Sequence, residues 1–295
     1  MAFGLLLAML SSAMFGLLPL FSIPAMDAGV GLNTVLIYRF GVATIAMGII
    51  AKCCRVSLRI KLRDLLMIFL ISLGYAGCSI FLTMSYNYMP SGIATTIFFL
   101  FPIIVAVMMV VIFKEKPSWK VVLAAVLAIG GVYLLQGTGQ HDPIQPVGIL
   151  VLACSMIAYS CYIVFLNHTR AKDLPNMQVM FYIFLCAFLI NFVKLLIMDG
   201  PHIDPLPDTR TLVNLIILGT VPTLIGDLIL IYAVKIVGST TASLLSCMEP
   251  ITAFIVGVLF FKDPFNPIQI AGLLVIIGSV FIVILTRSKI KNSRT

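Results

Sequence analysis

Charged residues are scarce in this chain of 295 residues. Asp, Glu, Lys and Arg together make up 10% of it, 61% of the residues are apolar, and the mean hydropathy is +1.15. Soluble domains carry about 25% charged residues, so a water-soluble globule is excluded. The longest connections between apolar runs, near residues 137–146 and 198–210, are too short to form a folded soluble domain.

Motifs that carry catalytic or cofactor chemistry are missing as well. The seven cysteines show no CxxC spacing and are typical of small packing residues in apolar segments. The three histidines, His141, His168 and His202, lie in predicted loops and form no HExxH or other close metal pair. No GxSxG, Walker loop or GxGxxG opens a helix, which argues against a serine hydrolase and an ATP-driven pump. We expect no enzyme activity, no cofactor and no metal.

Long apolar runs are what the chain does contain. A helix needs roughly 20 apolar residues to cross a bilayer, and lipid leaves the backbone no other hydrogen-bond partners. Ten runs are long enough: 3–24, 33–51, 65–86, 91–113, 119–136, 147–166, 177–197, 211–234, 239–261 and 268–286. The sequence therefore predicts an all-α integral membrane protein with ten transmembrane helices.

The net charge of +8 indicates membrane topology rather than an affinity for nucleic acid. Of the 19 Lys and Arg residues, Arg39 lies inside the second run, and Lys194, Arg210 and Lys262 fall on one side of the predicted membrane. The other fifteen, including those of residues 52–63 and the C-terminal tail, fall on the opposite side. Because basic residues accumulate in cytoplasmic loops, we expect both termini in the cytoplasm.

One stretch of the chain occurs twice. Residues 91–135 and 239–283 align without a gap at an offset of 148. Internal repetition in an apolar chain is typical of secondary transporters. Ten helices in two repeats give five each, and because five is odd, the second repeat inserts upside down. We expect the first repeat over 1–137, the second over 147–287 and a basic cytoplasmic tail over 288–295.

Ionisable side chains inside hydrocarbon are costly, so they usually face a cavity or a partner. Three lie well inside predicted helices, Arg39, Asp227 and Glu249, and Lys235 near the inner end of the eighth run is borderline. Glu249 stands beside Pro250, and the aligned position in the first repeat is Pro102, so both repeats carry a proline kink at the same place. Matched kinks indicate the binding site of a transporter. The alternative is a kinked packing helix whose glutamate bonds to a neighbour.

Asp227 belongs to a polar stripe that both repeats carry. Thr223 lies one turn before it, and the offset of 148 places Thr223 and Asp227 on Tyr75 and Ser79 of the third run. That stripe continues to Thr83. One interpretation is ordinary hydrogen bonding between helices, worth about 0.6–2 kcal/mol for each bond. Its repetition in both halves favours a shared aqueous cavity.

Arg39 and the aromatic residues each have two interpretations. Arg39 can bind a substrate carboxylate or pair with one of the two acids, and pairing is favoured because a buried arginine needs a partner even in the empty protein. Phe98 and Tyr159 can shape an apolar pocket, although aromatic residues in membrane helices more often serve packing. Ser246 lies on the same helical face as Glu249 and completes the candidate binding residues.

These motifs resemble those of the EamA-type transporters, the ten-helix branch of the drug/metabolite transporter superfamily, over essentially the whole chain. In that family each half ends in a proline helix, an acid at the hairpin and a glycine-containing last helix. The matching residues are Pro102, Glu115 and Gly130-Gly131 in the first half, and Glu249-Pro250, Asp263 and Gly278 in the second. Tyr38-Arg39-Phe40 and Tyr232-Ala233-Val234-Lys235 resemble two further family motifs. Asp263 replaces the more usual glutamate, and no acid precedes Pro102.

The resemblance implies a bacterial inner-membrane exporter of amino acids or other small metabolites, which works by alternating access around a site between the third, fourth, eighth and ninth helices. A proton is the coupling ion that the buried acids would carry. One alternative is proton-coupled efflux of lipophilic cationic drugs, with Glu249 as counter-ion. A more distant alternative is a membrane-embedded enzyme. Expected partners are a small-molecule substrate and membrane lipid, with no nucleic acid.

Overall fold

The structure is a computed structural model that describes residues 2–85, 88, 94, 97–114, 119–135, 145–198, 203–261 and 267–292. All regular secondary structure in these residues is helical, which confirms the predicted all-α fold. The elements are α1 (Ala2–Phe15), α2 (Leu18–Asp27), α3 (Leu32–Cys53), α4 (Leu62–Ser85), α6 (Phe101–Val111), α7 (Trp119–Leu135), α8 (Pro146–His168), η1 (Arg170–Lys172), α9 (Asn176–Met198), α10 (Thr209–Leu218), η2 (Gly219–Ile225), α11 (Gly226–Val237), α12 (Ser239–Leu245), α13 (Met248–Val256), η3 (Gly257–Phe261) and α14 (Pro267–Asn292).

Most of these helices are long and apolar enough to cross a membrane. Within the described residues, seven spans qualify by length and composition, and α1 with α2, α10 with α11, and α12 with α13 each make up one of them. Three shorter apolar segments, in α6, α7 and α14, complete the set. The protein is therefore an integral membrane protein, as its ten apolar runs predict.

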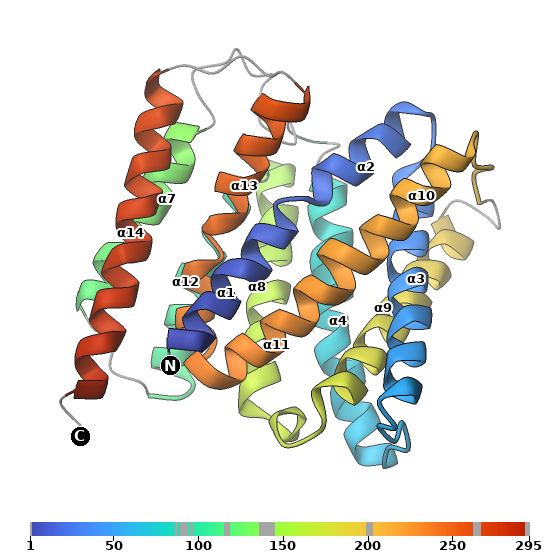
Figure 1. The fold of residues 1–295 in the computed structure, drawn as a ribbon, viewed down its shortest axis with the longest axis horizontal. Helices are drawn as coiled ribbons and strands as arrows, with labels where there is room; N and C mark the ends of the chain where they lie inside the picture. Colours follow the sequence, from blue (N-terminus) through green and yellow to red (C-terminus); the bar gives the residue numbers. More distant parts are fainter. Residues whose placement is uncertain are drawn as a thin grey trace.

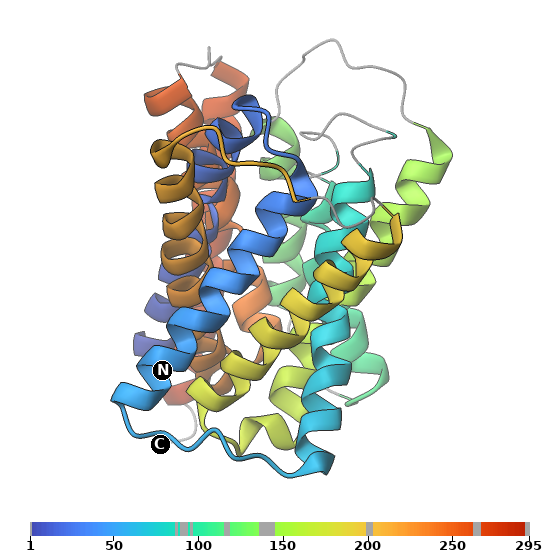
Figure 2. The same cartoon turned by 90° about the vertical axis from the view of Figure 1, so that its right-hand side faces the viewer.

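Successive spans alternate in direction, so that α1 begins and α14 ends on the same face of the molecule (Figure 1). α1 runs away from that face, whereas α8, which opens the second repeat, runs toward it. The two repeats are therefore inverted relative to one another. The loop between α3 and α4, which is rich in Lys and Arg, lies on the same face as the two chain ends (Figure 2).

Packing between helices follows the repeat. α4 packs along α8, and the counterparts of this pair under the offset of 148, α11 and α1, also pack along one another. α7 packs against α14 and α3 against α9, and within each of these pairs the two helices are counterparts. The first helix of each repeat thus lies against the third helix of the other repeat. The two halves are intertwined, which places polar residues of both at one centre.

Prolines interrupt several spans. A proline has no N–H, so it leaves the carbonyl four residues earlier without its helical partner. At the matched prolines the chain forms a turn, at residues 99–100 and 246–247, and a new helix starts with Pro102 or Pro250 in its first turn. These sites are breaks between two helices, so the ninth predicted run is not one continuous helix. The first run is also divided, at Gly16–Leu17 before Pro19.

The eighth span is distorted in a different way. Its middle section, η2, is a π-helix that contains Pro222, and η3 of the ninth span is a second π-helix. The counterpart of η2 in the first repeat, residues 71–77, is regular α-helix within α4. π-Helical turns are rare and concentrate at functional sites. The distortion lies directly before Asp227, which opens α11.

Candidate functional site

Asp227 and Tyr75 form a buried contact between the repeats. Asp227 has no exposed surface and Tyr75 is 7% exposed. The hydroxyl of Tyr75, on α4, donates a 2.6 Å hydrogen bond to Asp227 Oδ2, on α11. The third helix of one repeat is thereby joined to the third helix of the other. Ser79, half-buried, follows Tyr75 by one turn, whereas the side chain of Thr83 lies outside the described residues.

Arg39 is held by Thr223 rather than by an acid. Arg39 Nε donates a 2.8 Å hydrogen bond to Thr223 Oγ1, and among the described residues no direct ion pair joins Arg39 to Asp227 or Glu249. The expected pairing of Arg39 with a carboxylate is therefore wrong for this conformation. Instead, the charge lies 5.2 Å from the ring centroid of the neighbouring Phe40, close enough for a cation–π interaction.

The position of Thr223 follows from Pro222. Pro222 cannot donate to the carbonyl of Leu218, four residues earlier, because it has no N–H. Thr223 Oγ1 donates to that carbonyl instead, over 2.8 Å, and so leaves its lone pairs for Arg39. Thr223 has no exposed surface. The π-helix thus positions the Thr223 hydroxyl that binds Arg39. The sequence analysis did not identify Pro222 as part of the site.

Glu249 lies at the edge of the same cluster. Its side chain is half-buried in the first turn of α13 and forms no hydrogen bond with the described residues. It lies within electrostatic range of Arg39 and Asp227, and also of Tyr159 on α8. The structure therefore gathers all three intramembrane ionisable groups that the sequence singles out.

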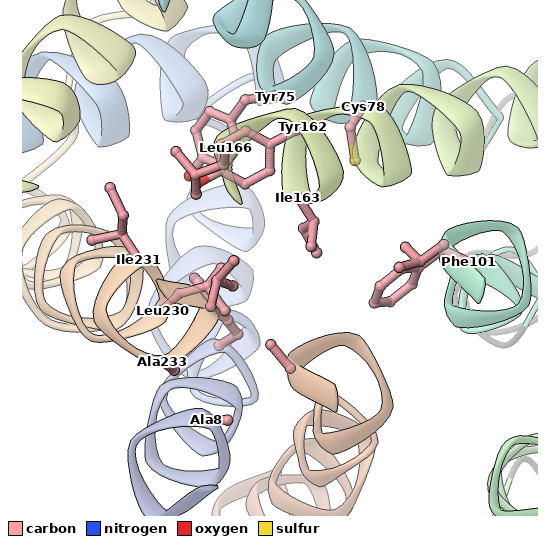
Figure 3. Packing of buried hydrophobic residues seen from close by; sticks show 14 of the residues in the cluster. Ala8, Tyr75, Cys78, Phe101, Tyr162, Ile163, Leu166, Leu230, Ile231 and Ala233 are labelled. Carbon is pink, nitrogen blue, oxygen red and sulfur yellow. The ribbon is translucent and has the colours of Figure 1, made fainter. Parts of the chain in front are cut away.

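A row of aromatic rings connects this cluster to the break before α6. Tyr75 lies 4.9 Å from Tyr162, Tyr162 lies 5.8 Å from Tyr159, and Tyr159 lies 4.8 Å from Phe101, measured between ring centroids. Phe98, also predicted for the site, packs on Tyr159 at 5.6 Å. Figure 3 shows Tyr75 and Tyr162 next to one another, and Phe101 of α6 at the right of the view. Tyr162 was not predicted, although it follows Tyr159 by one helical turn on the same face.

The carbonyl that Pro250 frees has a partner from the first span. Ser12 Oγ, on α1, donates a 2.8 Å hydrogen bond to the backbone oxygen of Ser246. The helix approaches closely here, because a Cβ atom on Gly16 would lie 2.5 Å from the carbonyl oxygen of Glu249. The hydroxyl of Ser246 itself bonds to its own helix, at Ala242. Ser246 therefore contributes its backbone rather than its side chain, and nothing in the sequence indicates Ser12.

The two matched breaks also face one another. Phe99 and Pro102 of the first repeat and Leu244 and Cys247 of the second line a cavity of about 10 Å³, with α7 completing the wall. A larger surface hollow of about 430 Å³, lined by residues 173–177, Val56 and Tyr232, contains none of the predicted site residues. The hairpin acids Glu115 and Asp263 lie outside the described residues.

Inverted repeats with polar contacts between them are an architecture from which many membrane transporters are built. The chain belongs to the EamA-like transporter family, whose sequence model matches residues 2–136 and 146–285. The predicted resemblance to that family is thereby confirmed.

Individual relatives support the same assignment. The chain is 25% identical over 205 residues to an uncharacterized transporter of Synechocystis sp., covering 68% of this chain and 61% of the relative. It is 24% identical over 237 residues to an uncharacterized transporter of Archaeoglobus fulgidus, covering 78% of this chain and 81% of the relative. A protein crystal structure shares the fold with a TM-score of 0.81 at 17% identity, covering 97% of this chain and 98% of the other.

Proposed function

We propose that the chain is a secondary active transporter that exports small polar, amino-acid-like metabolites across the bacterial inner membrane by alternating access. The observation that carries the proposal is the buried polar cluster that joins the repeats, Arg39 with Thr223 and Tyr75 with Asp227. Such groups are costly in hydrocarbon and are retained along substrate pathways. Asp227 and Thr223 have no exposed surface, so these two side chains are closed off from solvent in this conformation.

The charges of the cluster fit a zwitterionic substrate. Asp227 and Glu249 would attract an ammonium group, and Arg39, held on the other side by Thr223, would meet a carboxylate. Opening toward either side separates the helices that carry the two cross-repeat hydrogen bonds and frees these groups for the substrate. Buried carboxyl groups can also exchange protons with the solvent in open states, so a proton is the proposed coupling ion.

Export is tested by metabolite profiling of medium and cytosol from cells that express the wild type, Asp227→Asn, Glu249→Gln or the exposed-site control Asp208→Asn. We expect a small polar metabolite to accumulate outside cells with the wild type and the control, but not with the other two. Collapse of the proton gradient should abolish this accumulation. Unchanged export by both acid variants, with all proteins confirmed in the membrane, would contradict the proposal.

Efflux of lipophilic cations is the second candidate, and the aromatic row from Tyr75 to Phe101 favours it, since aromatic faces attract cations. Cells that express the wild type would then resist cationic dyes, and Glu249→Gln would remove the resistance. Unchanged sensitivity across a broad panel of dyes would eliminate this candidate.

A further inference from the structure

Two oxygen atoms in the polar cluster are buried without a partner. Asp227 Oδ1 and Tyr162 Oη form no hydrogen bond with any part of the chain that the structure describes. Neither side chain has any exposed surface. Buried polar atoms are nearly always paired in folded proteins, so an unpaired one calls for an explanation such as a ligand.

Both atoms belong to one place in the fold. Tyr75 contacts both side chains, since its hydroxyl bonds to Asp227 Oδ2 at 2.6 Å and its ring centroid lies 4.9 Å from that of Tyr162. The rings of Tyr75 and Tyr162 lie side by side in Figure 3. Tyr162 and Asp227 are also within electrostatic range of one another. They come from α8 and α11, which are the first and third helices of the second repeat, and α4 of the first repeat bridges them.

The chemistry of the two atoms selects the ligand. A carboxylate oxygen only accepts hydrogen bonds, and a tyrosine hydroxyl can accept one. A ligand that pairs both must therefore bring at least one N–H or O–H donor for Asp227, and an ionised Asp227 favours a cation. The guanidinium of Arg39 bonds to Thr223, one turn before Asp227, and Glu249 lies within electrostatic range of both Asp227 and Tyr159. An anionic group would meet these two carboxylates and is directed toward Arg39.

We infer that Asp227 Oδ1 and Tyr162 Oη form the subsite for a protonated amino group that carries N–H donors, a primary or secondary ammonium. A quaternary ammonium can approach the aromatic faces but leaves both oxygens unpaired, so this subsite discriminates against it. The inference rests on the proposed function and refines it, because it assigns the amino group to Asp227 and Tyr162 rather than to Glu249. Both atoms are buried in this conformation, so binding requires α8 and α11 to separate first, which lowers the apparent affinity.

Binding to the purified full chain in detergent tests this subsite without a transport assay. The probes are butylamine, butyltrimethylammonium and butyrate, and the readout is the ligand-induced increase in thermal unfolding temperature, which converts to affinity. The proteins are the wild type, Asp227→Asn, Tyr162→Phe and the matched control Tyr182→Phe, whose hydroxyl bonds to the Leu58 carbonyl outside the cluster.

We expect butylamine to bind the wild type and Tyr182→Phe at least about tenfold more tightly than butyltrimethylammonium. Tyr162→Phe should bind butylamine about tenfold more weakly, and Asp227→Asn should not bind it measurably. Equal affinity for the two amines, no binding of butylamine to the wild type, or full affinity in Tyr162→Phe would overturn the inference. If the two oxygens are bridged only by a buried water, Tyr162→Phe keeps the wild-type affinity.

Two controls keep the conclusions separate. If Asp227→Asn does not fold, Tyr162→Phe decides the question by itself, because loss of one hydroxyl leaves the ring packing in place. If the amine pattern appears but the wild type exports nothing, the subsite stands and the proposed export is wrong. If export occurs without the amine pattern, only the subsite is wrong.

Discussion

Thr223 shows how one side chain can compensate for a proline and bind a charge at once. Its hydroxyl donates to the Leu218 carbonyl that Pro222 leaves free and accepts from Arg39. The bond to Leu218 is buried and the bond from Arg39 is partly buried, so a lost partner is not fully replaced by water. The arginine therefore has a threonine as its hydrogen-bond partner, and the two acids act on it only through longer-range electrostatics.

Thr223→Val removes this hydroxyl while keeping the shape of the side chain. We expect a loss of about 1–3 kcal/mol in the free energy of unfolding, because the half-buried guanidinium of Arg39 and the carbonyl of Leu218 each lose a partner. Denaturation of the purified protein in detergent measures it. Thr220→Val is the matched control, since the Thr220 hydroxyl bonds only to carbonyls of its own helix. Equal losses for the two variants would show that the Arg39 bond contributes nothing.

The contact between α7 and α14 depends on a glycine that lets the two helix backbones come close together. α7 and α14, the last helices of the two repeats, approach at Gly131, where a Cβ atom would lie 2.6 Å from Ile276 Cγ1 and 2.8 Å from the Gly272 carbonyl oxygen. Small residues let helix backbones approach in membranes, where packing rather than the hydrophobic effect drives association. The neighbouring Gly130 has open space around it.

These two adjacent glycines allow a direct comparison. Gly131→Ala should destabilise the protein by about 1–3 kcal/mol, because the added methyl group separates α7 from α14. Gly130→Ala should stabilise it slightly, by up to about 1 kcal/mol, through higher helix propensity. Thermal unfolding of both variants against the wild type measures the difference. Similar unfolding temperatures for the two variants would contradict this packing.

The start of α10 gives a pH-dependent test. Asp208 caps this helix, and the hydrogen bonds from Thr211 to its carboxylate, from the hydroxyl and from the backbone N–H at 2.7 Å, lower the pKa of Asp208 below its ordinary value. Because its pKa is lower in the folded state, Asp208 stabilises the fold above its unfolded pKa. That contribution is lost as pH falls through the folded pKa.

Asp208→Asn keeps an oxygen at the cap but removes the titration. We expect wild type and variant to differ in unfolding temperature at neutral pH, with the wild type higher, and the difference to disappear in acid. Unfolding scans over a pH series measure it. A difference that stays constant across the series would mean that the charge of Asp208 has no part in capping.

The distribution of Lys and Arg predicts how the whole molecule is oriented in the membrane, with both termini in the cytoplasm. Cys53 and Cys54 are exposed at the end of α3. The loop that follows α3 lies on the face that carries both chain ends (Figure 2). With that face in the cytoplasm, a membrane-impermeant maleimide should label inside-out vesicles but not intact cells. Replacing both cysteines with serine should remove the label. Labelling of intact cells at these two residues would reverse the proposed topology.

The sequence predicts most of the transmembrane helices, but few of the side-chain contacts between them. The ten apolar runs and the inverted order follow from hydropathy and the parity of the repeat, and the described helices agree. The divisions at Gly16 and at residues 246–247 were not predicted as breaks, because a proline in an apolar run is also compatible with a bend. Arg39 was expected beside an acid, since sequence shows which charges are buried but not which hydroxyls lie near them.

The sequence by itself determined the membrane environment, the two inverted repeats and the three intramembrane ionisable residues Arg39, Asp227 and Glu249. These follow from composition, a fixed offset and the cost of charge in lipid, all of which are properties of the chain in order. Only the tertiary structure decided that Thr223 binds Arg39, that Tyr75 binds Asp227, and that Tyr162 lies beside them unpaired. Those contacts depend on how the helices of the two repeats intertwine, and they join residues that are far apart along the chain.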